Sequence, residues 1–434
     1  MWVLIALLLT QFAISTALSA LTLAHLRRMA GQPPQDWADR LDASQFPRMV
    51  AYATANTRLG HAARGADLCV ILAILLSGLL PTVTRWATSL GSSSSAPGGR
   101  VWQGLIVLAT PAMVSYLANV PWDLVSNFRV ERKFGFSTIT IKTWLMDQVK
   151  NLLISLVLGT LLGGGLLLLI GWLGRGWWIP AWILIWLFQL VMTFIAPVII
   201  LPLFSKFEPL QDRELSKQIT ALASGADLPL GGVFQVDASL RSTHSNAYFA
   251  GLGKTRRIAL FDTLLDQHSQ EQILAIVAHE IGHWKKRHVL RTIVAGCVVS
   301  GIGSALAATL LDLPWLYATI GVGELYMETG AVGPVAAVGM YLVGVLLSPL
   351  GLLLAPVATW FSQRHEHEAD AYSLALYEHP TALEEALIQS SEKNLANLFP
   401  HPLVVIFRYS HPPLRERVAA IRARWAERQK SPDG

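Results

Sequence analysis

Charged side chains and cysteines are both scarce in this chain of 434 residues. Asp, Glu, Lys and Arg make up 15% of it, whereas soluble proteins carry about 25%. Two cysteines cannot form the disulfide framework of a small secreted domain. Hydrophobic residues make up 53% and the mean hydropathy is +0.44, which excludes a disordered chain. The composition therefore indicates an integral membrane protein with a sizeable polar portion.

The net charge is +5, from 34 basic and 29 acidic side chains. A basic balance often signals nucleic-acid binding, but in a membrane protein basic loops face the anionic membrane surface. We therefore expect a lipid bilayer as a partner and no nucleic acid.

Seven apolar runs are long enough to cross a bilayer, which takes about 20 residues. They are 2–24, 66–86, 101–122, 151–174, 178–202, 289–311 and 333–357. The first has no basic residue before its apolar stretch, and Arg27 and Arg28 follow it. This is the charge pattern of a retained anchor with its N-terminus outside.

The loop charges agree with that orientation. The loops 25–65 and 123–150 contain eleven Lys and Arg residues, whereas the outer loops contain only Arg85, Arg100 and Arg175. This positive-inside bias predicts that the C-terminus is cytoplasmic. The segment 92–99 is predicted to be a flexible outer linker, because it consists of Ser, Gly, Pro and Ala.

Two long polar stretches, 203–288 and 358–434, then face the cytoplasm. They divide the chain into spans one to five (1–202), a protease segment (203–288), spans six and seven (289–357) and a C-terminal segment (358–434).

Short strands and a capped helix are predicted in the first polar stretch. Val233–Val236 and Ile258–Phe261 are β-branched and aromatic runs, and Asn246 lies between them at a presumed edge strand. Ser269, with Gln272 three residues later, predicts the start of a helix that continues past His283. The expected cytoplasmic unit is therefore of the α+β class.

That helix contains His279-Glu280-Ile281-Gly282-His283. Residues four apart share a helix face, so His279 and His283 can bind one Zn²⁺. Glu280 points slightly aside, where it can accept a proton from water as a general base.

A second cluster follows the seventh run. An open catalytic zinc site takes three protein ligands, and Glu366 can be the third. Asp370, one turn later, can accept the Nδ1–H of a ligand histidine. His365, His367 and Glu368 are competing ligands, although a helix would turn the two histidines away from the site.

Three further groups fit peptide hydrolysis. An edge strand at Asn246 can pair with an extended peptide. His411 precedes a basic C-terminal helix and can donate a hydrogen bond to a tetrahedral oxyanion. Arg417, further along that helix, can hold the carboxylates of the site.

The chain resembles the type 1 CAAX prenyl endopeptidases over most of its length. The resemblance is carried by Phe128, Glu131, Gly135, Phe136, Thr140, Asp147 and Lys150, by LFSKFEPL at 203–210, by RSTHSNAYF at 241–249, by Gly251, Gly253 and Lys254, by 257–265, and by HEIGHW, EHEAD and HPPLRER at 279–284, 366–370 and 411–417. The family usually has Arg where this chain has Gln363, which puts in question any salt bridge of that arginine.

The resemblance implies a fold, a cofactor and residue roles. The fold is an α-helical integral membrane protein in which seven transmembrane helices enclose a chamber beside a cytoplasmic α+β zinc metalloprotease domain. One Zn²⁺ per chain is held by His279, His283 and Glu366. The roles are the general base for Glu280, transition-state stabilisation for His411, support for Asp370 and Arg417, and substrate-backbone binding for Asn246 and Ala247.

The resulting hypothesis is a zinc metalloendopeptidase that cleaves hydrophobic or prenylated CAAX-type substrates, peptides or lipidated proteins, at a cytoplasmic site. One alternative is a quality-control protease of the heat-shock-linked membrane group, whose members have fewer spans. The other is a non-catalytic receptor or transporter with a structural zinc, which would need a fourth protein ligand such as His365 or His367.

Overall fold

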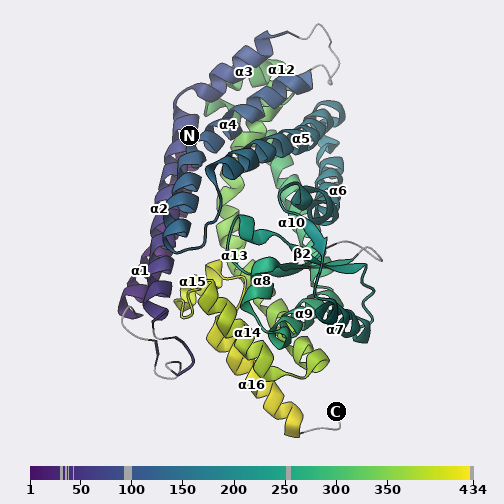
Figure 1. The fold of residues 1–434 in the computed structure, drawn as a ribbon. Helices are drawn as coiled ribbons and strands as arrows, with labels where there is room; N and C mark the ends of the chain where they lie inside the picture. Colours follow the sequence, from purple (N-terminus) through teal and green to yellow (C-terminus); the bar gives the residue numbers. More distant parts are fainter. Residues whose placement is uncertain are drawn as a thin grey trace.

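The computed structural model describes residues 1–29, 33–34, 37, 39–42, 44–91, 100–250 and 256–430. The predicted linker 92–99 and residues 251–254 of the family resemblance lie outside them. Long helices stand side by side in one half of the molecule, and a small sheet with shorter helices forms the other half (Figure 1).

Among the described residues, seven helices are long and apolar enough to cross a membrane, which confirms the predicted number. A π-helical turn, 126–131, extends α4, and irregular turns to Leu203 extend α6. The seven are α1 (Trp2–Met29), α2 (Phe46–Leu76), α4 (Val101–Val125), α5 (Ile141–Leu173), α6 (Trp178–Ile195), α10 (His288–Leu311) and α13 (Pro334–Tyr377). The chamber that the family resemblance implies stays a prediction.

The second span differs from its predicted position, 66–86. Helix α2 ends at Leu76, and Gly78 adopts a left-handed φ of 77° before a separate helix, α3 (Leu79–Ser89). The helix instead starts 20 residues earlier than predicted, at Phe46. The part of α2 outside the predicted span, 46–65, contains polar side chains such as Arg64, which hydrogen-bonds to Ser19 of α1. These side chains lower the mean hydropathy of this part, so the sequence did not indicate a span there.

The sheet has four short strands, β1 (Phe207–Pro209), β2 (Gly232–Val236), β3 (Ala247–Ala250) and β4 (Arg257–Phe261). Their order is β1-β2-β4-β3, with β2 and β4 parallel and the other pairs antiparallel. β2 and β4 confirm the two predicted strands, and β3 confirms the predicted edge strand, which begins at Ala247, one residue after Asn246. β1 was not predicted from the sequence.

Two helices cover the sheet, α7 (Arg213–Gly225) and α9 (Gln270–Lys285). Ile219, Leu260 and Ile281 are fully buried and form the core between them and β4. A capping box starts α9: Ser269 accepts from the backbone N–H of Gln272, and Gln272 accepts from that of Ser269. The predicted helix start is therefore confirmed.

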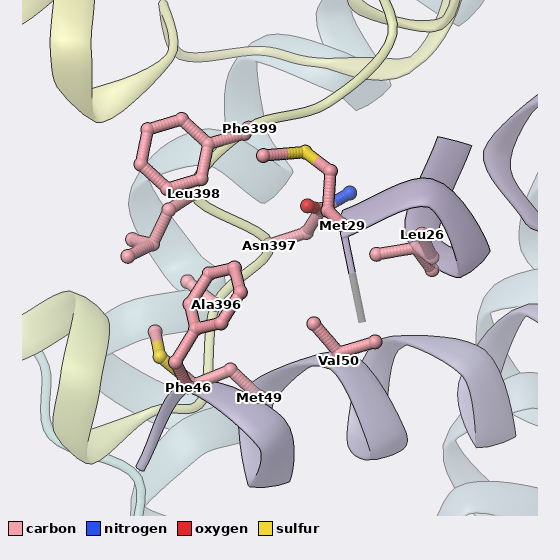
Figure 2. Close-up of a pocket in the computed structure, with 9 residues that line it drawn as sticks. All are labelled: Leu26, Met29, Phe46, Met49, Val50, Ala396, Asn397, Leu398 and Phe399. Carbon is pink, nitrogen blue, oxygen red and sulfur yellow. The ribbon is translucent and has the colours of Figure 1, made fainter. Parts of the chain in front are cut away.

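The C-terminal segment packs against both halves of the molecule. Its helices are α14 (Pro380–Lys393), α15 (Pro402–Arg408) and α16 (Leu414–Lys430). Figure 2 shows the ends of α1 and α2 meeting the segment 396–399 around a small apolar pocket, into which Met29 and Phe46 point. Three short helices complete the chain, α8 (Asp262–Gln267), α11 (Pro314–Ala318) and α12 (Gly323–Thr329).

Candidate metal centre

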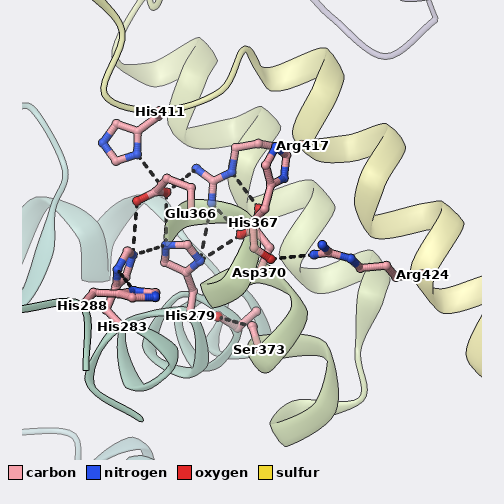
Figure 3. A network of polar contacts seen from close by, with 11 residues as sticks. His279, His283, His288, Glu366, His367, Asp370, Ser373, His411, Arg417 and Arg424 are labelled. Carbon is pink, nitrogen blue, oxygen red and sulfur yellow. Dashed lines mark hydrogen bonds and ion pairs between the residues drawn. The ribbon is translucent and has the colours of Figure 1, made fainter. Parts of the chain in front are cut away.

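Two helices bring the predicted ligands together. His279 and His283 lie one turn apart on α9, and Glu366 faces them from α13 (Figure 3). His279 Nε2 lies 3.1 Å from His283 Nε2 and 3.4 Å from Glu366 Oε2, and His283 Nε2 lies 3.2 Å from Glu366 Oε1. All three can place one ligand atom within 4.8 Å of the others.

These distances fit a zinc ion. Ligand atoms about 2.0–2.1 Å from a tetrahedral zinc are separated by about 3.3 Å. The three measured separations cluster around that value, and two imidazoles with one carboxylate are the donor set of an open catalytic site. The geometry leaves a fourth position for water or substrate.

Gly282 allows the two helices to approach closely enough. A Cβ on this residue would lie 2.9 Å from the carbonyl oxygen of Ala369 and 3.0 Å from its Cα. Both are backbone atoms of α13, so neither can rotate away. The glycine inside the motif thus sets the distance between the histidines and Glu366.

His279 is held by groups on its far side. Its Nδ1 lies 2.8 Å from Asp370 Oδ1, and Arg417 donates to both oxygens of Asp370, at 2.6 and 2.9 Å. Burial lowers the pKa of His279, but hydrogen bonds to Asp370 and Glu366 outweigh it and raise the pKa to about 9. The site therefore favours a positive charge, either a proton or a metal ion that replaces it.

His283 is held differently, by a residue that the sequence analysis did not single out. Its Nδ1 lies 2.9 Å from Nδ1 of His288, whose Nε2 lies 3.2 Å from Glu368. A proton on His288 Nε2 leaves its Nδ1 free to accept from His283, and this frees His283 Nε2 for a metal. The signal was a third histidine five residues after His283, at the first position of α10. The contacts of Glu368 are with His288, Arg291 and Arg364, so they do not support its role as a competing ligand.

Glu280 lies beside the ligand cluster on the wall of a cleft of about 440 Å³. Burial raises the pKa of its carboxyl, against the opposing effect of His279 and His283. A carboxylate whose pKa moves toward neutrality is a better match for proton transfer near pH 7.

The edge strand forms another wall of the same cleft. Asn246 and Ala247 line it, and Ala247 is paired on its other side with Leu260 of β4. Asn246 Oδ1 accepts from the backbone N–H of Ala247 at 2.8 Å, and its own carbonyl accepts from Phe261 at 3.0 Å. The outer edge of β3 is therefore directed at the cleft that also contains Glu280 and Glu366.

His411 reaches the cluster from the loop before α16. Its Nδ1 lies 2.8 Å from Glu366 Oε2, and its side chain is 61% exposed. With Nδ1 engaged by the carboxylate, Nε2 is the nitrogen left to meet a substrate. It can donate there only when the imidazole is doubly protonated.

The neighbours of Glu366 have other contacts. Gln363 Nε2 donates to the carbonyl of Tyr409 at 2.9 Å and so ties α13 to the segment that presents His411. The ring of His365 stacks on His288 with centroids 4.1 Å apart, and His367 accepts through its carbonyl from Arg424. Neither histidine belongs to the ligand cluster found among the described residues.

Comparison with known proteins shows the family of the chain. Residues 22–206 match the family model "CAAX prenyl protease N-terminal, five membrane helices", and residues 209–425 match "Peptidase family M48". CAAX prenyl protease 1 of Saccharomyces cerevisiae is 33% identical over 88% of this chain and 87% of its own. The uncharacterized metalloprotease YhfN of Bacillus subtilis is 30% identical over 88% and 87%. The crystal structure of S. mikatae Ste24p superposes with a TM-score of 0.87 at 30% identity, covering 97% of this chain and 98% of that one.

Proposed function

The chain belongs to peptidase family M48, and we propose that it cleaves prenylated or hydrophobic CAAX-type peptides at a cytoplasm-facing zinc site. Because it also carries the CAAX prenyl protease N-terminal region, it is a multi-pass membrane metalloprotease. The observation that carries the proposal is the position of Glu280. It lies beside the His279–His283–Glu366 cluster in a cleft bordered by an edge strand.

Each residue of the cleft has a part in the proposed reaction. His279, His283 and Glu366 would hold the zinc, and the bound metal would supply a Lewis acid for water and the scissile carbonyl. Asn246 and Ala247 hold the substrate backbone as an added strand on β3. Glu280 accepts a proton from the attacking water and passes it to the leaving amine. Doubly protonated His411 donates from Nε2 to the oxyanion that develops on the substrate.

Asp370 and Arg417 support the ligands without touching the substrate. The two charges are buried together, so each compensates for the desolvation of the other. Asp370 fixes the Nδ1–H tautomer of His279 and so leaves Nε2 free as a ligand.

A cleavage assay tests the substrate class and the metal dependence. Purified protein is given one CAAX peptide in prenylated and unprenylated forms, with and without a chelator, and zinc is added back after chelation. Zinc-restored cleavage, faster for the prenylated peptide, is expected. Cleavage that resists both chelation and Glu280→Gln would refute a metal-dependent reaction at this site. Metal retention without any cleavage would favour the structural-zinc alternative.

We further propose that the zinc site and the C-terminus are cytoplasmic and that the N-terminus is outside. The basic loops support this orientation. Lys217 is exposed on α7 and Met327 on α12. These two helices lie far apart, with α12 at the end of the molecule away from the sheet (Figure 1). On a background without Cys69 and Cys297, a cysteine at 217 should be labelled from the cytoplasmic side and one at 327 from the other. The reverse pattern would overturn the topology.

A further inference from the structure

Two arginines from different helices converge on one serine hydroxyl. Arg64 of α2 donates from Nη2 to Ser19 Oγ of α1 at 3.0 Å, and Arg408, the last residue of α15, donates from Nη1 to the same oxygen at 3.3 Å. Arg408 also donates from Nη2 to the carbonyl oxygen of Ser15 at 3.0 Å. All three contacts are to neutral acceptors.

The pair has no counterion among the described residues. Arg241 pairs with Asp147 and Arg417 with Asp370. Arg64, which is half-buried, and Arg408, which is exposed, form no ion pair within the part of the chain that the structure describes. Arg64 Nε is buried and makes no hydrogen bond. Burial and the nearby Arg64 guanidinium lower the pKa of Arg408. Two cations with spare donors therefore share a hydroxyl, and an anion beside them would accept charge-assisted hydrogen bonds.

Contacts with helix α13 give the spacing, along the axis of that helix, between Arg408 and the metal centre. Thr359 hydrogen-bonds to the carbonyl of Ile406 and Gln363 to that of Tyr409, so Arg408 sits at the level between 359 and 363. Glu366 follows three to seven residues later on the same helix, which is about 5–10 Å along its axis at 1.5 Å per residue. Arg408 also precedes His411, which contacts Glu366, by only three residues.

A peptide substrate carries an anion at a matching distance. A CAAX-type substrate cut before its last three residues would release a tripeptide, whose extended chain spans about 10 Å. This length matches the spacing along α13 between Arg408 and Glu366. We propose that Arg408 and Arg64 bind the C-terminal carboxylate of the substrate and thereby set cleavage three residues from a free chain end. The inference rests on the proposed peptidase function and adds a determinant of register.

A phospholipid headgroup offers the same anionic chemistry, so the test separates the two sources. One prenylated CAAX peptide is prepared as the free acid and as the C-terminal amide. Steady-state kinetics are measured in a non-ionic detergent, with and without added anionic phospholipid. The enzymes are the wild type, Arg408→Gln, Arg408→Lys and Arg428→Gln, the last removing a surface arginine that pairs with Glu378.

For the wild type and Arg428→Gln, amidation should raise KM about 10–100-fold, the range for losing a charge-assisted hydrogen bond. Arg408→Gln should cleave the acid as poorly as the amide, while its rate on the amide equals that of the wild type. Arg408→Lys should restore part of the preference for the acid. Equal zinc content in all variants confirms that the metal centre has formed.

Several results would overturn the inference. A wild-type enzyme that does not distinguish acid from amide has no carboxylate site. If Arg408→Gln lowers kcat/KM equally on the acid and the amide, Arg408 has a structural role. If it lowers kcat/KM only when anionic phospholipid is present, the pair is a headgroup site. Failure of the zinc-loaded wild type to cleave either peptide would instead refute the proposed function itself, a result distinct from loss of the acid preference.

Discussion

Gly282→Ala tests whether the close approach of α9 and α13 sets the metal geometry. The new methyl carbon would lie 2.9 Å from the carbonyl oxygen of Ala369, whereas ordinary contacts begin at 3.4 Å. The helices must therefore separate by about 0.5 Å, which is the limit within which functional constellations tolerate displacement. Ala369 lies three residues after Glu366 on the same helix, so the separation passes directly into the ligand distances.

The expected result is weaker zinc binding with a modest loss of stability. Zinc affinity should fall on the order of 10–100-fold, the scale seen when groups supporting a metal site are disturbed, and overpacking should cost about 1–3 kcal/mol of unfolding free energy. Competition with a chromophoric chelator measures the first, and thermal unfolding of the apo protein measures the second.

Gly344→Ala is the matched control, because it lies on α13 and a Cβ there has no atom within 4 Å. This variant should keep its zinc affinity, and its stability should stay level or rise by up to about 1 kcal/mol. Zinc affinity and activity of Gly282→Ala within threefold of the wild type would refute the argument that this glycine sets the spacing.

Four further outcomes are expected. Glu280→Gln should bind zinc and substrate but turn over at least about 10²-fold more slowly, and near-normal turnover would remove its role as base. Because burial raises the pKa of Glu280 and only the ionised form accepts a proton, kcat/KM should fall as pH drops through a value above 4.5, and a profile that is flat there would contradict this. His411→Ala should lower kcat about 10²–10³-fold with little change in KM, and a change in KM alone would make His411 a binding group. Asn246→Ala should instead raise KM at least as much as it lowers kcat. His288→Ala should weaken zinc binding about 10–100-fold, with partial recovery in His288→Gln, and unchanged affinity by chelator competition would show that His283 needs no such support.

The number of membrane spans and three of the four described strands were predictable from sequence, because each depends on a local pattern. Span number follows from apolar length, and the start of α9 follows from Ser269 and Gln272 alone. The second span was misplaced because its boundary depends on the left-handed turn at Gly78 and on which neighbour Arg64 faces. Neither is visible in a hydropathy average.

The site residues also fall into two groups, those placed by a local pattern and those placed by the packing of the chain. Residues one turn apart on a helix, such as His279 and His283, share a face whatever surrounds them. The support of His283 by His288 depends instead on how the chain turns between α9 and α10, at Arg287 with its φ of 57°. The pairing of Arg64 with Arg408 joins residues 344 positions apart and depends on how three helices pack. Sequence spacing carries no information on such a contact.

Helix α13 is part of both the membrane-spanning region and the metal centre. Its 44 residues run without a break from Pro334 to Tyr377, about 66 Å at 1.5 Å per residue, and the hydrocarbon core of a bilayer accounts for only about 30 Å of that. The rest of the helix extends beyond the hydrocarbon core and carries Glu366. A bilayer that changes the tilt of this helix swings the carboxylate relative to the histidines on α9. Hydrolysis should therefore vary with the acyl-chain length of the lipids in which the protein is reconstituted.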